Sequence, residues 1–140
     1  MKYITHKPYI IFWSLIPILL IYGFAFSKET LKINMYDTYF VIYWSHFFTF
    51  LSILFLGIGL LYFTIHKLNK KRRSLLSNIH LISTITATLV FIFTPLLSIS
   101  KSTEKIEEVA LIIRLISLVT IIVAQPILFL YLIISVFQKK

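Results

Sequence analysis

The sequence contains no cysteine, three glycines and four prolines among its 140 residues, and five acidic side chains stand against fourteen basic ones. Without cysteine the chain cannot form the disulfide framework that stabilises small secreted domains. Charged residues make up 14% of the chain, well below the roughly 25% of a soluble domain. Hydrophobic residues make up 59%, and a soluble domain of this size buries too little surface to hide so many. The composition excludes a soluble enzyme and a disordered tail, and indicates an integral membrane protein.

Four apolar segments follow one another along the chain, at residues 8–26, 40–65, 75–99 and 109–137. Each is long enough to cross the hydrocarbon core, about 30 Å thick, as an α-helix. Prolines inside such helices are tolerated as kinks, because neighbouring helices satisfy the freed carbonyl groups. We therefore predict an all-α membrane protein, a single four-helix transmembrane domain over residues 1–140 embedded in the lipid bilayer.

The basic residues are distributed unevenly between the two ends of these helices. The connection at residues 66–74 holds five basic residues and no acid, whereas the connections at 27–39 and 100–108 hold two lysines each together with all five acids. Counted with the termini, nine basic residues lie on one side and four on the other. The positive-inside rule predicts that both termini are cytoplasmic in a multi-pass protein of the cytoplasmic (inner) membrane. Basic flanks also explain the net charge of +9, so no nucleic-acid partner is expected.

Few strongly polar residues lie inside the apolar segments, and such residues are the first candidates for function. Arg114 lies close enough to its helix end to extend toward the membrane surface. Gln125 precedes Pro126 and is expected to cap the carbonyl that the proline leaves free. His80 lies about five residues into the third segment. His46 is expected six to eight residues into the second segment among aromatic residues, where a packed histidine and a haem ligand are both open interpretations.

A resemblance to a known family bears on His46. Residues 37–42 read D-T-Y-F-V-I, and His46 follows after Y-W-S. This resembles the D-T-Y-[FY]-V-[VI]-A-H-F-H-Y segment of subunit I of the haem–copper oxidases (cytochrome c oxidase subunit I). In that family the segment opens the tenth helix, and its two histidines bind the two haems.

Two weaker matches follow in the same order. Residues 78–81 (N-I-H-L) are similar to the K-I-H-F that opens the family's eleventh helix, and residues 91–95 (F-I-F-T-P) are similar to an F-F-P near that helix's outer end. On this alignment the four apolar segments correspond to the last four of the family's twelve helices. The resemblance implies that His46 holds the position of the ligand to the low-spin, electron-carrying haem.

The sequence lacks several residues that the family needs for oxygen reduction. Trp44 stands where the ligand of the oxygen-reducing haem would be, and an indole cannot ligate iron. The further histidines of the copper site are absent. The family's arginine pair for the haem propionates is also absent, and the nearest cations are Lys101, Lys105 and Arg114. Oxygen reduction is therefore not expected, and no other enzymatic activity is assigned.

The resemblance predicts a haem-binding membrane protein that transfers electrons or holds haem, with His46 as the iron ligand. The alternative is a cofactor-free membrane subunit or assembly factor of a respiratory complex. The residues expected to contact the haem ring or its propionates are Tyr43, Trp44, Phe50, Lys101 and Arg114.

The chain is also expected to associate with itself. The family's twelve helices form three four-helix arcs, so a four-helix chain would rebuild that ring as a homotrimer, which we favour over a dimer. Gly57 lies 11 residues after His46, within about 20° of the same helix face at 100° per residue, and would allow a neighbouring helix to approach closely.

Overall fold

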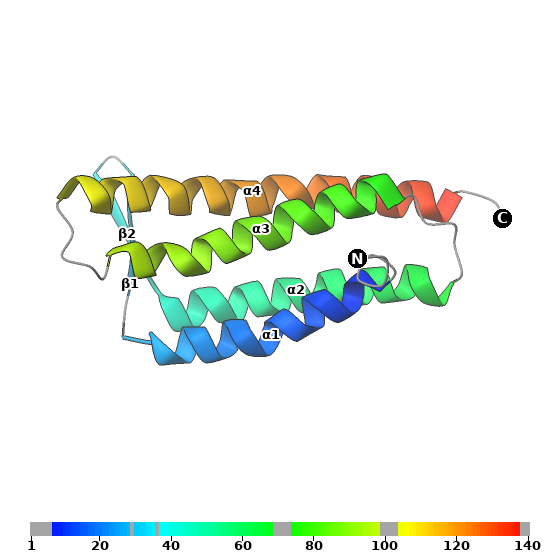
Figure 1. The fold of residues 1–140 in the computed structure, drawn as a ribbon, viewed down its shortest axis with the longest axis horizontal. Helices are drawn as coiled ribbons and strands as arrows, with labels where there is room; N and C mark the ends of the chain where they lie inside the picture. The colour runs from blue at the N-terminus through cyan, green and yellow to red at the C-terminus, as the bar shows by residue number, and fades with distance from the viewer. Residues whose placement is uncertain (1–6, 29, 36, 69–73, 99–103, 138–140) are drawn as a thin grey trace. The chain divides into compact units, whose positions relative to one another are not determined.

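The computed structural model describes residues 7–28, 30–35, 37–68, 74–98 and 104–137. Its elements fall into two compact units, the first over Met1–Asn69 and the second over Lys70–Lys140. Figure 1 shows them in chain order from blue to red. The elements of the first unit are α1 (Pro8–Ala25), β1 (Thr30–Met35), β2 (Thr38–Tyr43) and α2 (Trp44–Lys67), and those of the second are α3 (Ser74–Ser98) and α4 (Glu104–Phe137).

The four predicted helices are confirmed, and each is long and apolar enough to cross a membrane. The candidate spans are Pro8–Ala25, Trp44–Lys67, Leu75–Thr94 and Val109–Ser135. The spans of α1, α3 and α4 begin where the sequence predicts, whereas that of α2 begins later. The helix α4 itself is longer than its span and begins at Glu104. The chain is therefore a multi-pass membrane protein by its helices, whereas its organisation as one domain stays a prediction.

The connection between the first two helices contains a β-hairpin that the sequence analysis did not predict. Strands β1 and β2 are antiparallel, with Thr30 paired to Tyr43 and Met35 to Thr38. Residues 40–43 belong to β2, so the prediction that the second helix begins near residue 40 is wrong. The run from Phe40 to Tyr43 consists of aromatic and β-branched residues, which suit a strand as well as a membrane helix.

Helices α1 and α2 pack together as an antiparallel pair in the first unit (Figure 1). The buried residues of α2 alternate at spacings of four and three, which is the seven-residue pattern of a left-handed helix pair. They form one stripe, here called the α2 seam, which consists of Trp44, Phe48, Leu51, Phe55, Ile58, Tyr62 and Ile65.

Aromatic rings from α1 fill the spaces of the α2 seam. The ring of Phe12 is fully buried and lies with its centroid 5.3 Å from that of Phe55 and 5.8 Å from that of Tyr62. Nearer the other end of α1, the centroid of Tyr22 lies 5.1 Å from that of Phe48. Edge-to-face and offset pairs of this kind contribute attraction beyond their buried area, so they fix which side of α2 faces α1.

Two of the three glycines mark close contacts between α1 and α2. A Cβ atom at Gly23 would lie 2.7 Å from the Cβ of Phe48, and one at Gly59 would overlap the indole of Trp13. Gly57 differs, because a Cβ atom there would meet nothing within 4 Å. Small residues let membrane helices approach each other closely, and only Gly23 and Gly59 serve that purpose in this unit.

The seam between α3 and α4 has a different chemistry. Helix α4 buries residues at the same spacing of three and four from Ser117 to Ser135, but α3 presents hydroxyl groups and an imidazole where α2 presents aromatic rings. The second unit therefore buries polar groups inside the membrane span, and some of their hydroxyls donate to carbonyls of their own helices. Its buried polar residues are Ser77, His80, Thr84, Thr88 and Thr94 from α3 and Ser117 and Ser135 from α4.

The close contact at Gly23 can be tested against Gly57. Gly57→Ala gains helix propensity in the middle of α2 and meets no atom of this unit, whereas Gly23→Ala, in the last turn of α1, overlaps Phe48. We expect Gly23→Ala to be less stable than Gly57→Ala by about 1–3 kcal/mol, the range for overpacking a closely packed site. Unfolding in mixed micelles followed by far-ultraviolet circular dichroism measures this difference. Equal stabilities would show that Gly23 is not a contact point.

Candidate functional site

His46 is the third residue of α2, because the helix begins at Trp44. Its position along the helix axis is about 3 Å from the helix start at 1.5 Å per residue. The sequence analysis expected six to eight residues of helix before it, and that expectation is wrong because residues 40–43 are in β2. His46 therefore lies at the edge of the candidate membrane span rather than well inside it.

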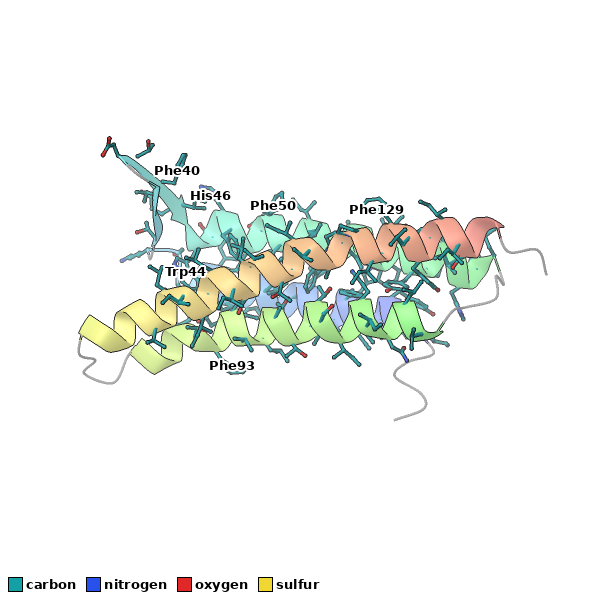
Figure 2. All side chains as sticks on the ribbon, turned by 90° about the horizontal axis from the view of Figure 1, so that it is seen from above. Phe40, Trp44, His46, Phe50, Phe93 and Phe129 are labelled. Carbon is teal, nitrogen blue, oxygen red and sulfur yellow. The ribbon has the colours of Figure 1, made fainter. Side chains whose placement is uncertain are left out.

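The imidazole of His46 is on the side of α2 opposite the α2 seam. Its side chain is exposed, as are those of Tyr43 and Phe50, at 52% and 67%. The ring centroids of Tyr43 and His46 are 6.0 Å apart in an edge-to-face arrangement, and Phe50 lies one helical turn beyond His46. Figure 2 shows His46 and Phe50 on the same side of α2.

This exposed side continues along the helix as one stripe. We call it the His46 face, and it includes the well-exposed side chains of Ile53 (63%) and Leu60 (48%). Gly57 lies on the same stripe, with open space where its side chain would be. The full set of residues on the His46 face is Tyr43, His46, Phe50, Ile53, Gly57 and Leu60.

Trp44, also expected beside the haem, faces the other way. Its side chain is 3% exposed and belongs to the α2 seam. Its ring centroid lies 5.4 Å from that of Phe48 and 6.1 Å from that of Tyr22 on α1. Residues two apart in a helix point about 200° apart, so Trp44 packs against α1 while His46 faces outward.

The two cations expected at the propionates are not part of the first unit. Lys101 lies outside the described residues. Arg114 lies on α4, four residues after the buried Ala110 and three before the buried Ser117, and so on the same side of the helix as both. Its side chain is half-buried, and its Nε atom is buried. Arg114 thus occupies an inward position in α4, and its role beside a haem stays a prediction.

A second polar cluster joins α3 to α4 around His80. His80 is fully buried, and its imidazole hydrogen-bonds to the side chain of Gln125. The Nε2 of Gln125 also donates to the carbonyl of Ile121 at 2.7 Å. The carbonyl that Pro126 leaves without its helical donor is that of Ile122, four residues earlier. The expected cap on that carbonyl is therefore wrong, because the Gln125 amide links Ile121 to His80 instead.

His80 and Gln125 are separate candidates in the sequence, and their contact is seen only in the structure. A signal was available, since His80 follows the spacing of Ser77, Thr84 and Thr88 on one face of α3. A polar stripe at helical spacing in an otherwise apolar segment indicates a buried helix contact.

A lateral hollow of about 420 Å³ also lies between α3 and α4, lined partly by Ser83, Thr86, Ser117 and Thr120. A smaller hollow of about 250 Å³ shares Ser83 and Thr120 with it. Three of these hydroxyl groups donate to carbonyls of their own helices, at 3.1 Å for Ser83 and 2.8 Å for Ser117 and Thr120. These three hydroxyls therefore have helix partners of their own, and the hollow is mainly apolar.

In the part of the chain that the structure describes, no three His, Asp or Glu side chains come together as a metal cluster. A haem iron needs no such cluster, because one or two axial side chains hold it. The described part of the first unit offers two exposed imidazoles beside aromatic rings, His46 next to Tyr43 and His66 next to Tyr9 of α1.

No protein-family model, curated protein sequence or solved structure matches this chain. The relationship to the haem–copper oxidases therefore stays a prediction that rests on the residues of the resemblance.

The contact between His80 and Gln125 gives a prediction that distinguishes pairing from packing. Gln125→Leu leaves the buried imidazole without its amide partner and should lower the unfolding free energy by about 1–3 kcal/mol. In the double variant His80→Leu with Gln125→Leu, both polar groups are replaced, and part of that loss should be recovered. A double-mutant cycle of unfolding free energies measures the coupling, which we expect at about 0.5–1.5 kcal/mol. Strictly additive losses would contradict the pairing.

Proposed function

We propose that this chain is a haem-binding integral membrane protein in which the His46 imidazole is an axial ligand of the iron. An exposed imidazole beside aromatic rings at the edge of a membrane span is the observation that carries this proposal, and the resemblance at residues 37–42 favours His46 over His66. The role is electron transfer or haem holding, without oxygen reduction. When bound, haem supplies a one-electron redox centre whose potential depends on its axial ligands and surroundings.

The residues around His46 fit one half of a haem site. Tyr43 and Phe50 flank the imidazole and supply an aromatic wall for an apolar ring, and all three side chains are accessible. A site at the edge of the membrane span also suits the two propionates of haem, which are charged and remain near the polar headgroups. The propionate contacts expected from the sequence, Arg114 and Lys101, belong to the second unit and stay a prediction.

The other half of the site comes from elsewhere, because the His46 face is open. A second wall and any sixth ligand are proposed to come from another copy of the chain, in a homotrimer rather than a dimer. Cyclic closure lets every copy use the same two surfaces. The open space at Gly57 supports this arrangement, since it leaves room for a neighbouring helix backbone.

The proposed setting is the cytoplasmic membrane with both termini in the cytoplasm. Four spans return the chain to the side on which it began. Helix α2 ends with His66 and Lys67, next to the most basic connection of the chain, and cations at a helix C-terminus are favourable. The connection that contains the hairpin then lies on the outer side.

The alternative function is a cofactor-free subunit or assembly factor of a respiratory complex. The exposed His46 face also favours this alternative, because it could accept a helix of another membrane protein in the space that Gly57 leaves. The optical spectrum separates the two functions.

The purified protein, supplied with haem during expression, should show a Soret band and sharp α and β bands on reduction. His46→Ala should abolish most bound haem. His66→Ala removes another exposed imidazole at the far end of the same helix and serves as the matched control. Haem content per chain is measured by the pyridine haemochrome assay. Loss of haem with His80→Ala but not with His46→Ala would move the ligand to the second unit, and no haem in the unsubstituted protein would favour the cofactor-free function.

The oligomer can be tested without touching the ligand. Gly57→Leu fills the open space on the His46 face, and the α1–α2 contacts should survive because nothing lies within 4 Å of that position. We expect native mass spectrometry in mild detergent to show a trimer for the unsubstituted chain and a shift toward monomer for Gly57→Leu, with haem content falling in parallel. A monomer that retains all its haem would show that the haem site lies within one chain.

A further inference from the structure

The β1–β2 hairpin has two chemically different faces. Successive residues of a strand alternate between faces, and directly paired residues share one. Phe40 and Ile42 lie on one face of β2, and the register pairs them with Ile33 and Leu31 of β1. Val41, on the other face, pairs with Lys32. One face is therefore apolar at both of these pairs, and the other combines apolar and charged positions.

The hairpin is held close to the membrane by its connections. Helix α1 ends at Ala25 and strand β1 begins five residues later at Thr30, whereas β2 passes into α2 between Tyr43 and Trp44 with no intervening residue. Phe40 is thus four residues from the first residue of a membrane span, at most about 13 Å even for extended chain. The headgroup layer on each side of the hydrocarbon is roughly 5–7 Å thick.

The direction of the strands decides whether the hairpin stands away from the membrane or lies along it. Figure 1 shows β1 and β2 running across the direction of α1 and α2, and Figure 2 shows the hairpin, with Phe40, leaning away from the start of α2. Since α1 and α2 cross the bilayer, strands that run across them extend along the membrane plane.

An isolated two-stranded hairpin is at best marginally stable in water, so its apolar face needs a cover. Phe40 is 49% exposed and Ile42 is 37% exposed, so these two side chains are still partly uncovered within the chain. Because the hairpin connects two membrane spans, the surface next to it is the polar–apolar boundary of the bilayer.

We propose that the hairpin is a membrane-interface anchor that lies along the headgroup layer, with Phe40 and Ile42 directed to the acyl chains and Val41 directed to water. Its partner is the lipid surface itself. This arrangement stabilises the hairpin by removing apolar side chains from water, and it fixes the start of α2 at the membrane edge. It does not depend on haem binding.

The absence of cysteine allows a direct test by single spin labels. Phe40→Cys and Val41→Cys are a matched pair, because both positions are about half exposed, at 49% and 56%, but lie on opposite faces. Ile18→Cys, at a 53% exposed position of α1 outside the His46 face, is the reference for lipid. Lys28→Cys, at an exposed position before the hairpin, is the reference for water. The full chain is reconstituted in phosphatidylcholine vesicles containing phosphatidylglycerol.

Power saturation measures access of each label to oxygen, which partitions into lipid, and to a water-soluble nickel chelate. The ratio of oxygen to nickel access at position 40 should approach that at position 18 and exceed the ratio at position 41 several-fold. Ile42→Cys, on the same face as Phe40, replaces Phe40→Cys if that variant does not fold. Equal nickel access at positions 40 and 41 would show that the hairpin stands clear of the bilayer. A label at position 40 shielded from both reagents would show that protein, and not lipid, covers this face, and either result overturns the proposal.

Discussion

The packing of α1 against the α2 seam is the constraint on which the candidate site depends. Aromatic rings spaced at seven-residue intervals fill this contact, and at Gly23 the Phe48 side chain approaches the α1 backbone directly. A rotation of α2 about its axis would separate these rings and place Phe48 against a different part of α1. The rotation of α2 is therefore fixed, and with it the outward direction of His46.

The two units use opposite means to hold a pair of membrane helices. The first relies on close packing, because aromatic rings fill the contact and glycines let α1 and α2 approach each other. The second relies on polar groups such as His80 and Gln125, which cannot be left unsatisfied in hydrocarbon. Lipid is as apolar as the helices, so either close packing or hydrogen bonding has to supply the attraction.

The open position of His46 connects the proposed function to assembly. An imidazole that faces outward from a helix pair is accessible to a cofactor or to a neighbouring chain, but one exposed helix face does not enclose a flat ring. Haem binding and self-association are therefore proposed as parts of one arrangement. The hairpin that precedes α2 is also relevant to His46, because the proposed interface anchor joins the start of this helix without an intervening residue.

The number and approximate positions of the membrane spans followed from the sequence alone. The length of an apolar segment can be read directly from the sequence and compared with the thickness of the bilayer. The polar residues inside those spans were equally visible. What the tertiary structure decided was how these residues are arranged. Residues 40–43 are compatible with helix or strand, and only their pairing with residues 30–33 settles the choice.

The same holds for the direction of each side chain. In a helix that is apolar on every side, hydropathy does not distinguish the packed side from the lipid side. Contacts with α1 turn Trp44 inward and His46 outward, and contacts between α3 and α4 join His80 to Gln125. The sequence by itself determined how many segments can cross the membrane and roughly where they lie. Only helix packing, which joins residues far apart in the chain, decided which of their residues face one another.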